Sequence, residues 1–161
     1  AKRKNILRGL ATYRFSQSDN QPAKICEGLF VGSIGAANNV GVVKSLGIGS
    51  VLTLCTEKVE QLETVQYRIV SDLRDAAEQD ISSRLHDFCD FIKTGLELRG
   101  GVLVHCYQGK SRSVSVVAAF LIREHGLTLT EALEHIRAAR PLAAPNLGFL
   151  MQLRKWERQC S

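Results

Sequence analysis

The sequence predicts an α/β fold in which a central, mostly parallel sheet of about five strands is flanked by helices. Short apolar runs alternate along the chain with segments whose apolar residues recur at helical spacing. Strands that alternate with helices are typical of a layered α/β domain with a largely parallel sheet. In addition, a polar loop at residues 105–113 directly follows one apolar run, and such sheets bind ligands beyond the carboxyl ends of their strands.

The first half of this domain is expected to contain strands and one short helix. The predicted elements are an entry strand or hairpin at 25–31, a helix with Ala36, Val40 and Val43 on one face that ends at Gly47, and short buried strands at 51–54 and 67–70.

The second half is expected to be mainly helical. The predicted elements are a long amphipathic helix from Ile81 to Leu96 with Asp80 as its N-cap, a strand at 102–105, a buried helix at 111–124, a helix that begins at the capping box of Thr128 and Glu131, and a last helix that starts at Asn146. The helix at 111–124 is apolar on nearly every side, which places it in the centre of the domain.

Residues 105–113 read His-Cys-Tyr-Gln-Gly-Lys-Ser-Arg-Ser. Cys106 precedes Arg112, Gly109 lies between them, and a helical pattern begins one residue before the arginine. A helix N-terminus offers unpaired N–H groups and the positive end of a dipole, and glycine permits the backbone angles of an anion nest. The same field favours a thiolate, and a guanidinium binds two phosphate oxygens at once. The loop therefore predicts a site that holds a phosphate dianion against the sulfur of Cys106.

Two other kinds of site are excluded by spacing. A nucleotide-binding P-loop needs a glycine five residues before Gly109, where this chain has Val104. A zinc site needs spaced Cys or His pairs, and Cys106 has no C-x-x-C partner. We therefore expect no metal and no cofactor.

The pattern His105-Cys106-x-x-Gly109-x-x-Arg112-Ser113 resembles the signature loop of cysteine-dependent dual-specificity protein phosphatases. The similarity covers residues 25 to 157, with an opening segment at 27–33 and a closing segment at 140–153. It implies hydrolysis of phosphotyrosine and phosphoserine or phosphothreonine through a phosphocysteine. The phosphate-binding residues that it implies are Tyr107, Gln108, Gly109, Lys110, Ser111 and Arg112.

The resemblance also implies an acid that protonates the leaving oxygen and then activates water. The family places an Asp on a loop upstream of the cysteine, ahead of an apolar residue and a Ser that begin a helix. Asp75 has this spacing to Ile81 and Ser82. Asp72, nearer the preceding strand, is the alternative.

Four further residues are expected to support the site. Ser113 is placed to donate a hydrogen bond to the sulfur, and His105 matches a family residue that orients the loop. Asn146 matches an Asn that braces the loop, and it also suits a helix cap. Arg140 is expected at the pocket rim, in contact with substrate.

Composition agrees with one domain that works in a reducing compartment. The chain has 161 residues, of which 45% are hydrophobic, and this is enough for a full core. No apolar stretch reaches the length of a membrane span. Five cysteines at irregular spacing argue against a disulfide framework. We therefore expect a cytoplasmic protein, with the nucleus as the other compartment, although one thiol could still pair with Cys106.

The distribution of charge divides the chain into two parts. Residues 1–23 are expected to form a basic and polar N-terminal extension, and residues 24–161 the catalytic domain.

The net charge of +5 suits phosphorylated substrates. The chain has no basic stripe interleaved with aromatic residues, a pattern that would predict nucleic acid binding. The expected partner is a phosphoprotein, with a protein kinase as one candidate. Basic segments in the extension and around Trp156 leave membrane-surface or calmodulin contact open.

Two alternatives to a protein phosphatase remain at this point. A phosphoinositide or another non-protein phosphomonoester is one, although the loop has only one lysine, Lys110. A catalytically silent phospho-binding module is the other, although such relatives typically lose the cysteine, the arginine or the acid.

Overall fold

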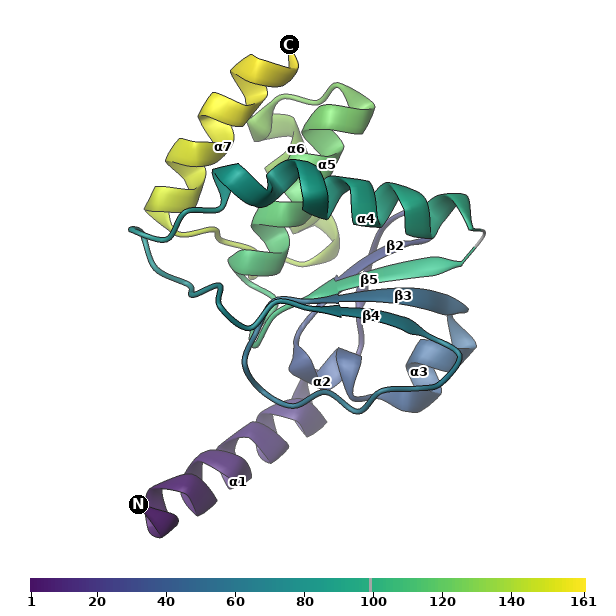
Figure 1. Ribbon diagram of the computed structural model, residues 1–161, viewed down its shortest axis with the longest axis vertical. Coiled ribbons are helices and arrows are strands. Elements are labelled where there is room, and N and C mark those ends of the chain that lie inside the picture. Colours follow the sequence, from purple (N-terminus) through teal and green to yellow (C-terminus); the bar gives the residue numbers. More distant parts are fainter. Residues whose placement is uncertain (99) are drawn as a thin grey trace.

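The structure is a computed structural model and describes residues 1–98 and 100–161. Its centre is a five-stranded sheet with the order β1-β2-β5-β3-β4 (Figure 1). The strands are β1 (Ala23–Cys26), β2 (Leu29–Gly32), β3 (Ile48–Thr53), β4 (Gln66–Ile69) and β5 (Gly101–His105). Only the β1–β2 pair is antiparallel among these strands. The predicted α/β fold with a mostly parallel sheet is confirmed.

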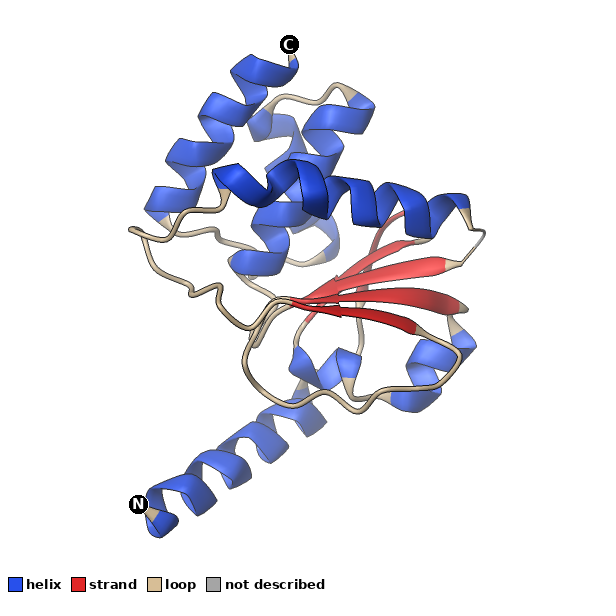
Figure 2. Cartoon of the chain, in the orientation of Figure 1, coloured by secondary structure: helices blue, strands red, loops and turns tan. Residues whose placement is uncertain are grey.

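Helices cover both faces of the sheet (Figures 1 and 2). One face carries α4 (Leu85–Glu97), α5 (Arg112–His125), α6 (Leu129–Ala139) and α7 (Leu147–Cys160), and the other carries α2 (Ile34–Ala37) and α3 (Val40–Ser45). The central strand β5 shows how the core is divided. Val102 and Val104 pack into the cluster under α4 to α7, whereas Leu103 packs with α2 and α3, because side chains alternate across a strand.

Helix α5 is buried along most of its length, as its apolar sequence predicts. Its residues from Ser113 to Ile122 are all buried. The helix ends at Gly126, whose φ of 66° is left-handed and favours glycine. Helix α7 packs against it, with the indole N–H of Trp156 donating to the carbonyl of Ala119 at 3.0 Å. Helix α5, which begins at the loop of Cys106, is thus held in the packed core.

Several helix signals in the sequence are confirmed. The capping box of Thr128 and Glu131 begins α6, and the side chain of Asn146 caps α7.

The expectation that Asp80 caps a long helix beginning at Ile81 was wrong. The short 3₁₀ helix η1 (Ser82–Arg84) comes first, with Ile81 at its N-cap position, and α4 begins at Leu85 without a side-chain cap. Asp80 still accepts a bond from the Ser83 N–H at 3.4 Å.

Two further expectations were wrong. The helix expected from Ala36 to Gly47 is two short helices, because the side chain of Asn39 caps a new helix start by accepting from the Val42 N–H. The strand expected at 67–70 is not buried, since β4 lies at the edge of the sheet and Ile69 is half exposed. An apolar strand sequence does not reveal whether a second strand covers it.

The N-terminal extension forms α1 (Lys2–Ser18), none of whose residues is buried. The helix projects from the body, and its C-terminal end contacts α2 (Figure 1). Gly35 of α2 makes this contact possible, because a Cβ there would lie 2.2 Å from the carbonyl oxygen of Asp19. The domain boundary at residues 23 and 24 stays a prediction. Within residues 1–98 and 100–161, no helix has both the length and the apolar character needed to cross a bilayer.

Candidate active site

The loop between β5 and α5 holds Cys106 at the carboxyl end of the central strand. Only 2% of Cys106 is exposed. Its sulfur accepts a hydrogen bond from the Gly109 N–H at 3.2 Å and lies 3.2 Å from the hydroxyl of Ser113. The loop thus brings Cys106 next to Ser113, the residue predicted to hydrogen-bond to its sulfur.

Gly109 is required at the tightest point of the loop. Its φ of 65° is left-handed, a conformation that other residues adopt at a cost. A Cβ at this position would lie 2.5 Å from the carbonyl group of Gly32 and 2.8 Å from Arg140. No larger residue fits without displacing the loop from its supports.

Every carbonyl of the loop, from residue 106 to residue 111, accepts a hydrogen bond from a group outside the loop. The donors are the His105 ring for Cys106, the Ile34 N–H for Tyr107, Arg140 for Gln108 and Gly109, the Ala144 N–H for Lys110, and Ser115 for Ser111.

This arrangement fixes the direction of the loop N–H groups. A trans peptide is planar, so the N–H of each residue points opposite to the carbonyl of the residue before it. With six carbonyls bound outward, the N–H groups of residues 107–112 point to the inside of the loop. The bond from the Gly109 N–H to Cys106 is a direct example. The loop is therefore an anion nest in front of a helix N-terminus.

Arg140 supports this loop from behind and does not lie at the pocket rim, as had been expected. Only 6% of the residue is exposed. Its Nε and Nη2 atoms donate to the carbonyls of Gly109 and Gln108, both at 2.7 Å. Asp19 accepts from Nη2 at 2.8 Å, so the charge of the guanidinium is paired. The substrate-binding expectation is wrong because this side chain is fully used inside the protein.

Arg112, the first residue of α5, keeps an unused donor at the site. Its Nη1 donates to the carbonyl of Leu73 at 3.2 Å. Its Nε is buried and has no hydrogen-bond partner in the described part of the chain. A buried donor without a partner costs about 1–3 kcal/mol. An oxyanion bound in the nest would satisfy this atom.

His105 is neutral and holds the base of the loop. Its Nδ1 lies 3.1 Å from the carbonyl of Cys106, which only accepts, so Nδ1 carries the proton. Its Nε2 then accepts from the hydroxyl of Thr53 at 2.8 Å. Burial lowers the pKa of His105 to about 4. The sequence did not single out Thr53, although it lies directly opposite His105 in the β3–β5 register.

Asp75 lies on an exposed loop between β4 and η1, which passes the start of α7 (Figure 1). The side-chain N–H of Asn146 donates to its carboxylate at 2.8 Å. The loop between β5 and α5, residues 106–111, is called the phosphate loop below. The backbone N–H of Asn146 donates to the hydroxyl of Ser111 in this loop at 2.9 Å. Asn146 therefore serves as both a helix cap and a bridge between the acid candidate and the phosphate loop.

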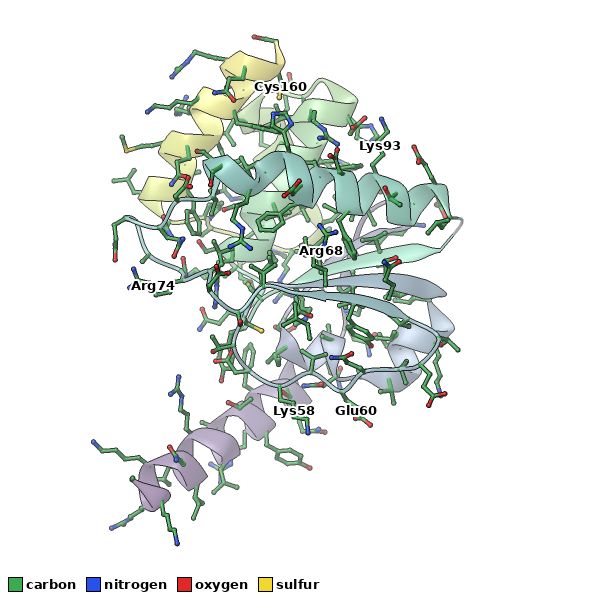
Figure 3. All side chains as sticks on the ribbon, in the orientation of Figure 1. Lys58, Glu60, Arg68, Arg74, Lys93 and Cys160 are labelled. Atoms are coloured by element: carbon green, nitrogen blue, oxygen red, sulfur yellow. The ribbon has the colours of Figure 1, made fainter. Side chains whose placement is uncertain are left out.

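Two contacts with α7 hold the rest of this loop. Gly148 lets the chain pass closely, since a Cβ there would lie 1.9 Å from the carbonyl oxygen of Ala77. The side chain of Gln152 accepts from the N–H groups of Ile81 and Ser82, at 2.8 and 3.0 Å. Arg74, in contrast, turns outward from the loop (Figure 3).

Asp72, the alternative acid, has a different partner. Arg84 donates to its carboxylate at 2.8 Å, and this bond lowers the pKa of Asp72. Its side chain is 75% exposed. The structure thus joins Asp75, rather than Asp72, to the phosphate loop by hydrogen bonds through Asn146.

Two residues of the phosphate loop face different surroundings. The side chain of Lys110 is exposed, whereas Tyr107 contacts the N-terminal extension. The Tyr107 ring stacks on Phe15 with centroids 5.4 Å apart, and its hydroxyl lies 3.1 Å from that of Thr12. No sequence pattern indicated that the extension reaches the site.

The five cysteines are free thiols. Cys55 is buried, and its burial together with the nearby Glu57 and Cys106 raises its pKa to about 12. In residues 1–98 and 100–161, no group of three or more His, Cys, Asp or Glu side chains is arranged to hold a metal ion.

Comparison with known proteins identifies the class to which this site belongs. A sequence model of the dual specificity phosphatase catalytic domain matches residues 29–159. Dual specificity protein phosphatase 1 of Arabidopsis thaliana is 36% identical over 154 residues, which cover 95% of this chain and 77% of the relative. Dual specificity phosphatase 28 of Mus musculus is 34% identical over 140 residues, which cover 84% of this chain and 83% of the relative.

A solved structure agrees with these matches. The crystal structure of a mouse putative dual specificity phosphatase complexed with zinc tungstate aligns with a TM-score of 0.83 and 30% identity, covering 87% of this chain and 88% of the mouse chain. The chain belongs to the dual specificity phosphatase family. It is a cysteine-dependent protein phosphatase with the length of a catalytic domain.

Proposed function

We propose that this protein hydrolyses phosphotyrosine and phosphoserine or phosphothreonine in proteins, with Cys106 as nucleophile, Arg112 as phosphate ligand and Asp75 as acid and base. The buried Arg112 Nε without a partner carries this proposal. Arg112 begins α5, directly after the loop whose N–H groups point inward, and an oxyanion bound in that loop would offer its Nε an acceptor oxygen.

In the first step, the thiolate of Cys106 attacks phosphorus in line with the leaving oxygen. The S–P bond forms while the P–O bond to the substrate breaks. Asp75 gives its proton to the departing alkoxide or phenoxide, which leaves as a neutral alcohol. Arg112 and the N–H groups of residues 107–112 bind the phosphoryl oxygens and stabilise their charge in the transition state.

In the second step, water attacks the phosphocysteine. Asp75, now a carboxylate, takes a proton from the water, the S–P bond breaks, and inorganic phosphate leaves. The hydroxyl of Ser113 stabilises the departing Cys106 sulfur as it regains its negative charge. No metal ion takes part, since Arg112 and the loop N–H groups supply the positive field.

We further propose a signalling role on a phosphoprotein such as a protein kinase, in the cytoplasm or nucleus. The free thiols support a reducing compartment. The crystal structure of the mouse relative is of a complex with zinc tungstate. Tungstate is a tetrahedral oxyanion like phosphate, and a bound anion of that shape would suit this loop.

The other candidate functions have less support. A silent phospho-binding module needs no acid, yet Asp75 is held next to the loop by Asn146. A phosphoinositide phosphatase would gain from several cations in the loop, and Lys110 is the single lysine there.

The test is hydrolysis of para-nitrophenyl phosphate in EDTA and reductant by the wild-type protein and by Cys106→Ser. We expect turnover by the wild type and none above background by the variant, because serine is not ionised near neutral pH. A folded, reduced wild type with no turnover between pH 5 and 8 would contradict the proposed function. Phosphopeptide and phosphoinositide binding would then be measured instead.

A further inference from the structure

A shallow, open cleft of about 430 Å³ lies between α1 and the segment that follows β3. One wall is formed by Asn5, Arg8, Gly9 and Thr12 of α1, and the other by Thr56, Glu57 and Lys58. Figure 3 shows Lys58 on the side of the molecule from which α1 projects. The cleft is therefore built by the N-terminal extension together with the catalytic domain.

The cleft begins next to the phosphate loop. Thr12 lines it, and the hydroxyl of Thr12 lies 3.1 Å from that of Tyr107, the residue after Cys106. On the other wall, the Leu54 N–H donates to the carbonyl of His105 at 2.9 Å. Thr56 follows two residues later, so this wall also starts beside the nucleophile.

Both walls are anchored. Asn38 accepts from the Glu60 N–H at 2.8 Å and so holds the segment that carries Lys58. Helix α1 is held where it ends, through the Asp19–Arg140 ion pair and the stacking of Phe15 on Tyr107. The end of the cleft nearest the loop of Cys106 therefore has fixed walls, which lowers the cost of ordering a ligand at that end.

The charge of the cleft favours an acidic ligand. Residues 1–18 contain five Lys or Arg and no Asp or Glu, and the whole chain has 21 against 16. The rest of the chain is therefore neutral, and the positive charge is concentrated on α1. Arg8 and Lys58 face the cleft from its two walls, and neither forms an ion pair within residues 1–98 and 100–161. Glu57 is the acid that lines the cleft.

We propose that this cleft binds the substrate chain beside the phosphorylated residue, and that Arg8 and Lys58 select substrates with an acidic group there. The group is a carboxylate of Asp or Glu, or a second phosphate. The inference rests on the proposed function and names the class of phosphoprotein that the site prefers. An acidic peptide of this kind would place its phosphorylated residue in the loop and its neighbouring residues between α1 and Lys58.

The test compares three substrates on the double variant Arg8→Gln, Lys58→Gln. The substrates are para-nitrophenyl phosphate, a phosphotyrosine peptide with flanking Asp and Glu, and the same peptide with Asn and Gln. An exposed ion pair between Arg8 or Lys58 and an acidic group of the peptide should change kcat/KM a few-fold. We therefore expect kcat/KM for the acidic peptide to fall about tenfold when both cations are removed. The other two substrates should change less than twofold, which also shows that the variant is folded.

The matched control is Lys44→Gln, Lys155→Gln, which removes two exposed lysines from α3 and α7. It should leave kcat/KM for the acidic peptide unchanged within twofold.

Three further measurements use the same assay. Glu57→Gln should raise kcat/KM for the acidic peptide. A doubly phosphorylated peptide tests whether the cleft prefers a phosphate or a carboxylate. Raising the salt concentration should weaken the preference.

Equal losses with all three substrates, or no loss with any, would overturn the inference. So would an unchanged peptide preference combined with weaker binding of the double variant to anionic phosphatidylserine vesicles, which would make α1 a membrane contact. If the wild type does not hydrolyse para-nitrophenyl phosphate, the proposed function fails instead, and the two failures are therefore distinguishable.

Discussion

The phosphate loop and the acid-bearing loop differ sharply in how the protein holds them. In the phosphate loop, Cys106 and Gly109 are buried, and all six carbonyls from residue 106 to residue 111 are bound. In the loop from residue 71 to residue 80, most residues are exposed, and Asp75 is held by one bond from Asn146.

This difference corresponds to the two tasks of the site. Stabilising a charged transition state requires donors that are already oriented, since reorienting them during the reaction costs energy. Proton transfer needs a carboxyl group within reach of leaving groups of different size, from a serine oxygen to a tyrosine oxygen. A buried nest and an exposed carboxylate therefore fit the two roles that we propose for Cys106 with Arg112 and for Asp75.

The largest effect is expected from the rigid loop. Arg112→Lys keeps the positive charge but loses the planar group and its Nε donor. We expect kcat for para-nitrophenyl phosphate to fall on the order of 10³-fold, because a donor to the transition state is removed. A loss of less than tenfold would show that the guanidinium geometry is not needed.

The next effect is expected from Asp75, the acid that we propose. Asp75→Asn should lower kcat for a phosphoserine peptide on the order of 10²-fold, because an alkoxide leaves poorly without a proton. Para-nitrophenolate leaves more easily, so that substrate should lose less. Asp72→Asn is the matched control and should change neither rate more than twofold, and the reverse result would make Asp72 the acid.

A smaller effect is expected behind the phosphate loop. Arg140→Met leaves the carbonyls of Gln108 and Gly109 without their donor, which should lower the free energy of unfolding by about 3 kcal/mol. The rate should fall only about tenfold, because Arg140 does not touch substrate and acts by positioning the loop. Denaturant unfolding and kcat/KM measure the two effects. A variant that is as stable as the wild type but binds substrate more weakly would show that Arg140 contacts substrate at the pocket rim.

The smallest effect is expected from His105. Its pKa of about 4 in the folded protein lies below the ordinary value of 6.5, so the unfolded chain binds a proton first as the pH falls. Its contribution to stability is complete above pH 6.5 and is lost toward pH 4. We expect a loss of about 2 kcal/mol by pH 5. The variant His105→Gln should show a flatter pH dependence of the unfolding free energy, and an equal slope would contradict the assignment.

The sequence predicted the parts of the site that are contiguous in the chain. Cys106, Gly109 and Arg112 lie in one loop between a strand and a helix, so their order alone defines the nest. Asp75 could be proposed only from its resemblance to a family pattern, because nothing in an exposed carboxylate distinguishes it from Asp72.

His105, Ser113 and Asn146 were expected as supporting residues, but the partners that hold the loop from distant segments, such as Asp19 and Thr53, could not be predicted. Asp19 pairs with Arg140 across 121 positions, and Asp19 belongs to no local motif. The helix α1 was also missed, because it buries no residue and so lacks an apolar face packed on the core. The split at Asn39 shows the same limit, since a polar cap can end an apolar pattern.

The most direct test of the account is to trap the covalent intermediate on the phosphate loop. Asp75→Asn should still be phosphorylated by para-nitrophenyl phosphate, whose leaving group needs little acid, but should hydrolyse the intermediate slowly. Acid quenching and mass spectrometry of the peptides should then find one phosphate on Cys106 and none in Asp75→Asn, Cys106→Ser. Rapid turnover with no phosphate on Cys106, or a phosphate on another residue, would contradict the assignment of this loop as the catalytic centre.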